Sequence, residues 1–105
     1  MKKLYNLNQK GVKKMSQIYD LQIKVVDQKG ECPVGHKIGE TFYIKEGKSP
    51  TGLCMTALSA LIPGISVLIV GASFPWEEDP AVTCRSCQDY KNPVIFEIRR
   101  IPKAD

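Results

Sequence analysis

Four cysteines and one histidine are the side chains of this chain that are best suited to chemistry. Cys84 and Cys87 form a C-x-x-C pair, a spacing that lets two sulfurs reach one tetrahedral metal ion. Cys32 and His36 are separated by three residues in a Pro/Gly segment, a spacing that is also compatible with two ligands. A Cys₃His set is typical of structural zinc, and thiolates favour zinc over iron. The sequence therefore predicts a small metal-binding domain.

Two other interpretations of the cysteines stay open. In the first, the cysteines are buried or idle thiols. In the second, the protein is a thiol-based redox or small-molecule enzyme that uses Cys54 or Cys87 with His36. Cys54 follows helix-start signals, where the helix dipole and free N–H groups favour a thiolate. Cys54 also fits the apolar stripe of that helix, which suits a core residue. His36 is the only imidazole that could act as a base, although loop histidines are as often solvated as functional.

A loop bracketed by prolines carries Trp76 followed by three acidic residues, 77–79. Glu77 is the third catalytic candidate beside Cys54 and His36, because a carboxylate could act as a base or offer oxygen ligands. Trp76 could form the wall of a pocket. The alternative is a solvated acidic face on which the tryptophan anchors the loop to the core.

Hydrophobic periodicity predicts the elements that must position these residues. Alternating apolar and polar residues predict strands over 19–26, 41–45, 81–85 and 94–101. Residues 50–62 carry an apolar stripe at helical spacing, after a Ser-Pro-Thr start and before Pro63-Gly64. The apolar run 65–71 is rich in valine and isoleucine, which predicts a central strand buried on both faces.

These elements predict a single α+β domain over residues 19–103, with a small, mostly antiparallel sheet of four to five strands packed on one central helix. The net charge of +4 is uneven, since residues 1–14 hold five lysines and no acid, leaving ten basic and eleven acidic residues elsewhere. Residues 1–18 are predicted to be a flexible basic extension, with Met15 as a candidate natural start. No nucleic-acid partner is expected, because such binding needs basic residues on a folded face.

The run 53–74 has the length of a membrane span, but Pro63, Gly64 and polar residues interrupt it. A buried helix followed by a strand is therefore favoured, and no membrane partner is expected. The beginning of the chain lacks the apolar core of a secretory signal, which predicts a cytoplasmic protein with reduced thiols. One helix on a thin sheet leaves apolar surface, which predicts a homo-oligomer. An oligomeric interaction module without chemistry is the third functional hypothesis.

Four motifs occur in order along the chain: GECPxGHKxG from Gly30, GLCxxAL from Gly52, FPWEEDP from Phe74 and NPVxFE from Asn92. Over residues 21–101 the chain resembles a family of short, uncharacterised bacterial and archaeal proteins. The resemblance implies no activity. It does rank the candidate ligands, because Cys32, His36, Cys54 and Cys87 match positions where the family carries Cys or His. Cys84 falls where the family has a strand residue, which makes it the alternate ligand.

Overall fold

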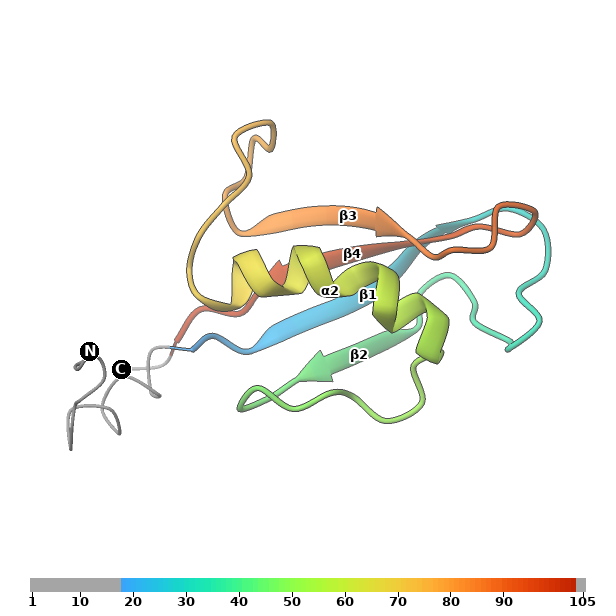
Figure 1. Cartoon of the computed structure of the whole chain (residues 1–105), viewed down its shortest axis with the longest axis horizontal. Coiled ribbons are helices and arrows are strands. Elements are labelled where there is room, and N and C mark those ends of the chain that lie inside the picture. Colours follow the sequence, from blue (N-terminus) through green and yellow to red (C-terminus); the bar gives the residue numbers. More distant parts are fainter. Residues whose placement is uncertain (1–17, 104–105) are drawn as a thin grey trace.

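The computed structural model describes residues 18–103, which form a four-stranded antiparallel sheet with one helix on one face (Figure 1). The strand order is β2-β1-β4-β3, so the first and last strands pair at the centre. The elements are β1 (Leu21–Gln28), β2 (Thr41–Ile44), α2 (Met55–Ile69), β3 (Val82–Ser86) and β4 (Val94–Arg100). The predicted α+β class with a small antiparallel sheet on one helix is confirmed. The predicted basic extension lies outside the described residues except for Ile18.

The strands bury alternate residues against α2, as their sequence pattern predicts. In β4, the side chains of Val94, Phe96 and Ile98 are buried, whereas those of Glu97 and Arg99 face the other side of the sheet. β1 and β2 follow the same alternation, and their buried residues complete the sheet side of the core. These buried residues are Leu21, Ile23, Val25, Phe42 and Ile44.

The predicted strand over 65–71 is wrong, because the helix continues through Pro63 and Gly64 to Ile69. The buried residues of α2 recur at helical spacing on both sides of the proline: Ala57, Leu61, Gly64, Ile65 and Leu68. Pro63 is exposed, so its ring lies on the solvent side and the helix loses one backbone hydrogen bond. Packing of a continuous apolar stripe outweighs that loss.

The start of the helix also differs from the prediction. α2 begins at Met55, with Cys54 as its N-cap residue, whereas residues 50–54 form a turn and an irregular segment. Gly52 has a φ of 90°, a left-handed conformation that a helix cannot contain. Cys54 is therefore at the very end of the helix, where backbone N–H groups lack intrahelical partners.

Two loop regions flank the helix at opposite ends. The loop after β1 and the β3–β4 connection meet near the N-terminal end of α2, whereas the loop with Trp76 projects beside its C-terminal end (Figure 1). Over residues 18–103, no helix has both the length and the apolarity needed to cross a bilayer.

Candidate thiol pocket

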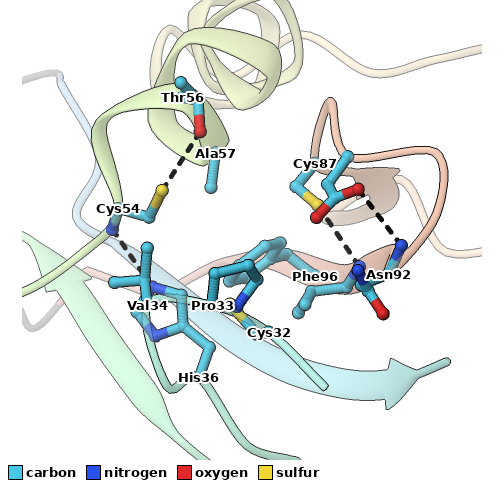
Figure 2. A pocket seen from close by; sticks show the side chains of 12 residues that line it. Cys32, Pro33, Val34, His36, Cys54, Thr56, Ala57, Cys87, Asn92 and Phe96 are labelled. Atoms are coloured by element: carbon cyan, nitrogen blue, oxygen red, sulfur yellow. Dashed lines mark hydrogen bonds between the residues drawn. The ribbon is translucent and has the colours of Figure 1, made fainter. Parts of the chain in front are cut away.

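Three of the four cysteines line one cavity of about 110 Å³ at the N-terminal end of α2. Cys32 comes from the loop after β1, Cys54 from the helix start and Cys87 from the end of β3 (Figure 2). His36 lines the same cavity. The other lining residues, which are mostly apolar, are Pro33, Val34, Thr56, Ala57, Asp89, Asn92, Val94 and Phe96. Folding thus brings together the four residues that the resemblance ranked first.

Side-chain hydrogen bonds join the three segments pairwise around the cavity. The first loop meets the helix where His36 Nε2 accepts the backbone N–H of Cys54, at 3.1 Å. The helix meets the β3–β4 connection where Gln88 Nε2 donates to Ser59 Oγ and to the carbonyl oxygen of Thr56. The two loops meet where Asn92 Oδ1 accepts the N–H of Glu31. Each cysteine-bearing segment is therefore held by both of the others.

The loop contact also explains a glycine. Gly30 has a φ of 76°, and a Cβ at this position would collide with the side chain of Asn92. Only glycine combines this backbone conformation with so close an approach. The first residue of the GECPxGHKxG motif therefore seats the Cys32 loop against the β3–β4 connection.

His36 is 3% exposed, and both of its ring nitrogens are occupied. Its Nδ1 donates to Glu40 Oε1 at 2.8 Å, which leaves Nε2 as the acceptor for the Cys54 N–H. The ring also packs edge-on against Phe42 and Phe96, with centroids 5.3 and 6.0 Å away. Neither nitrogen is free to take a proton from a cysteine or to bind a metal. In this arrangement the histidine positions the start of the helix.

The environment of Cys54 lowers the pKa of its thiol below the usual 9.0. The largest cause is the Thr56 hydroxyl, whose Oγ1 lies 3.1 Å from Sγ, and the backbone N–H of Ala57 adds to the effect. Partial burial opposes both by disfavouring the charged form. The backbone N–H of Thr56 also lowers the pKa of Cys54, as donors at a helix N-terminus do for an anion.

Cys32 and Cys87 are partly buried and pack against the hydrophobic core. Cys87 Sγ accepts the backbone N–H of Val94 at 3.3 Å, while its own N–H bonds the Val94 carbonyl. Cys32 lies in a tight turn, since its carbonyl accepts the N–H of Gly35 at 2.9 Å. That turn leads directly to His36, so Cys32 is carried by the same loop that contacts the Cys54 backbone.

Two predicted site residues lie away from this cavity. Cys84 points to the face of the sheet opposite α2, because its neighbour Thr83 is the buried residue of β3. Burial raises the pKa of the Cys84 thiol, and Glu97 and Glu77 raise it further. Glu77 accepts a hydrogen bond from Thr83 Oγ1 at 2.8 Å, and does not line the cavity.

The rest of the acidic loop also stays near the C-terminal end of α2. Trp76 stacks on Phe74 at a centroid distance of 4.9 Å and is not part of the cavity wall. Asp79 Oδ1 accepts the N–H of Ala81 and so stabilises the turn into β3. The acidic loop and the three cysteines of the cavity therefore do not form one site.

The candidate metal ligands do not converge on one point among residues 18–103. Among residues 18–103 there is no group of three or more His, Cys, Asp or Glu side chains placed to hold one. The three thiols surround a cavity instead of one point, and the nitrogens of His36 are used elsewhere. Tetrahedral zinc needs sulfur ligands at about 2.3 Å. The zinc and iron predictions stay untested predictions.

Sequence reasoning missed the residues that hold the pocket together. Glu40, Thr56, Gln88 and Asn92 supply its positioning hydrogen bonds. Glu40 lies four residues after His36, and Asn92 lies within the NPVxFE motif, so the sequence near each of them offered a reason to consider it. No such reason existed for Gln88, because its hydrogen bonds join distant segments, whereas Thr56 lies only two residues after Cys54.

Comparison of this chain with models of protein families, with curated proteins and with solved structures gave no match. The resemblance to a family of short bacterial and archaeal proteins therefore stays a prediction.

Proposed function

We propose that this protein is a thiol-based enzyme or redox protein in which Cys54 is the reacting thiolate. The observation that carries the proposal is a cysteine at a helix N-terminus that opens onto an apolar cavity bordered by two further thiols. The lowered pKa of Cys54 supports it, because the thiolate is the nucleophilic form. His36 acts here as a positioning residue for the Cys54 backbone.

Competitive alkylation tests the proposal. The full chain is treated at neutral pH with a limiting amount of iodoacetamide, and the labelled cysteines are mapped by peptide mass spectrometry. Cys54 is expected to react several-fold faster than Cys84, whose pKa is raised. Cys84→Ser is the matched control and should leave the rate at Cys54 unchanged. Equal rates at the two cysteines would refute the proposal.

A metal-binding domain is the second candidate. One observation favours it, namely that Cys32, Cys54 and Cys87 approach one cavity from three segments. Binding zinc would require the three thiols to move closer to one another. Cys84 cannot serve as a further ligand, because it lies on the opposite face of the sheet. Elemental analysis of protein purified without oxygen should find about one zinc per chain if this candidate is correct. A chelator should then lower the melting temperature.

The remaining predictions belong to the same proposal. The cytoplasm keeps thiols reduced, so we propose that compartment for this protein. A homo-oligomer is proposed because α2 leaves the second face of the sheet without a covering layer in the part of the chain that the structure describes. Sedimentation equilibrium tests this. A monomeric mass would argue against both the oligomer and the hypothesis of a purely structural interaction module.

A further inference from the structure

The size of the cavity limits what can reach Cys54. Its volume of about 110 Å³ is somewhat below that of a 150 Å³ engineered cavity that holds one benzene. Pockets for drug-sized ligands and cofactors are several times larger, about 300–1,000 Å³. The cavity therefore suits one side chain or a fragment of similar size.

The three segments that line the cavity each carry an exposed apolar side chain. Val34 lines the cavity and is 60% exposed, Met55 follows Cys54 and is 80% exposed, and Tyr90 lies in the β3–β4 connection and is 83% exposed. We name these three residues the apolar rim. They come from the same three segments as the cysteines. Methionine and tyrosine are enriched where proteins contact one another, so the rim suits the apolar flanks of a polypeptide.

The presence of more than one thiol favours disulfide exchange over other reactions of a thiolate. Exchange uses one attacking thiol and one resolving thiol, and it needs no reactant other than a disulfide. Cys32 is the better placed resolving thiol, because its loop is bonded to the Cys54 backbone through His36. Cys87 is less suitable, because its sulfur is engaged by the Val94 N–H.

We infer that the pocket receives a disulfide carried by a polypeptide partner, whose apolar flanking residues dock on the apolar rim. This inference rests on the proposed thiolate function of Cys54. The Cys54 thiolate attacks one partner sulfur, so that a Cys54–partner bond forms, the partner disulfide breaks and its other sulfur leaves as a thiolate. The Cys32 thiolate then attacks Cys54, forming a Cys32–Cys54 disulfide and releasing the second partner sulfur. Two electrons pass to the partner, and its thiolates take their protons from water.

A trapping experiment with the full chain tests the chemistry. The probe is a synthetic peptide with one internal disulfide flanked by leucine and phenylalanine, and the products are resolved by mass spectrometry without reductant. Wild type should form the Cys32–Cys54 disulfide and release reduced peptide. Cys32→Ser should instead accumulate a Cys54–peptide mixed disulfide. Cys84→Ser, on the opposite face of the sheet, should behave as wild type.

Several outcomes would overturn the inference. Rapid alkylation of Cys54 without any mixed disulfide in Cys32→Ser would refute it while leaving the proposed function intact. Accumulation of the mixed disulfide in Cys87→Ser instead would refute the role of Cys32. Slow alkylation of Cys54 would remove the proposed function itself.

The partner class is tested by comparing two disulfides. The second probe is hydroxyethyl disulfide, which is small and has no flanking residues. Tyr90→Ser and Val34→Ser should lower the rate with the apolar peptide several-fold relative to the rate with the small disulfide. Tyr43→Ser is the matched control, because Tyr43 is exposed on the far face of the sheet. An unchanged ratio in the rim variants would show that the pocket takes small disulfides, which would overturn the polypeptide assignment.

Discussion

The buried imidazole of His36 connects the Cys32 loop to the start of α2. It satisfies the N–H of Cys54, which lies at the helix end where backbone donors lack intrahelical partners. Its other nitrogen is held by Glu40, which fixes the ring and the tautomer. His36, the only imidazole candidate for a base, therefore has a structural role. The lowered pKa of the Cys54 thiol comes from Thr56 and the helix end.

Replacing His36 by phenylalanine tests this role. His36→Phe retains an aromatic ring against Phe42 and Phe96 but leaves the Cys54 N–H without its acceptor. We expect a loss of about 1–3 kcal/mol in the free energy of unfolding, the usual cost of a buried unsatisfied donor. Urea denaturation measures it. Glu40→Gln is the control and should lose less, because an amide oxygen still accepts the Nδ1–H. Unchanged stability in His36→Phe would contradict the role.

The Thr56 hydroxyl bears on the proposed reactivity of Cys54 through the pKa of its thiol. This hydroxyl is the largest cause of the lowered pKa, so Thr56→Val should raise that pKa toward the usual 9.0. At neutral pH the thiolate fraction then falls and alkylation of Cys54 slows, whereas above pH 9 the two proteins should react alike. The measurement is the rate of alkylation against pH. Ser66→Ala removes another exposed hydroxyl of α2, which bonds the Ile62 carbonyl and lies outside the cavity, and should leave the profile unchanged.

The members of the site could be predicted from the sequence, but its geometry could not. Cysteine and histidine at distant positions indicated chemistry, and the resemblance selected Cys32, His36, Cys54 and Cys87, which all line the cavity. The C-x-x-C spacing favoured Cys84 instead. That spacing shows only that two thiols are close along the chain, and does not show which face of a strand each thiol occupies. A residue list also cannot show that both nitrogens of His36 are already bonded.

At the scale of elements, α2 shows how packing overrides local stop signals. Proline followed by glycine normally ends a helix, and here the pair lies at its middle. Gly64 explains the arrangement, because a Cβ there would lie 3.2 Å from Ile98 Cδ1 and 3.3 Å from Thr83 Cγ2. The glycine lets the helix approach the sheet closely, while the proline occupies the exposed side. β-branched residues after Gly64 suggested a strand, yet their burial follows the helical period.

Substitutions of Pro63 and of Gly64 should change the free energy of unfolding in opposite directions. Pro63→Ala restores an N–H that can bond the Ser59 carbonyl on an exposed helix face, and we expect a gain of roughly 1 kcal/mol in unfolding free energy. Gly64→Val should lose about 1–3 kcal/mol, because its methyl groups crowd Ile98 and Thr83. Thermal or urea unfolding of both variants measures the difference. Destabilisation by Pro63→Ala would show that the proline has a packing role.

At the scale of the whole molecule, the described chain divides into a central strand pair and an end that carries the cavity. β1 and β4 come from opposite ends of the described chain, pair along most of their length and occupy the middle of the sheet. The pocket is built instead from a loop, a helix end and a turn, held by side-chain hydrogen bonds of which most are exposed. Such bonds open more easily than a central strand ladder.

Hydrogen exchange should show this division directly. The amides of Ile23, Phe96 and Ile98 lie within the paired central strands, and the side chains of these residues are fully buried, so these amides should exchange only through global unfolding. Amides of the loops over 30–40 and 88–92 should exchange faster through local opening.

If the Cys32 loop must move to bring its thiol to Cys54, the Cys54 amide, which is bonded to His36, should exchange with that loop and not with β1 and β4. Exchange of the Cys54 amide at the rate of the central strands would show a rigid pocket, and would leave the Cys32 thiol too constrained to resolve a mixed disulfide.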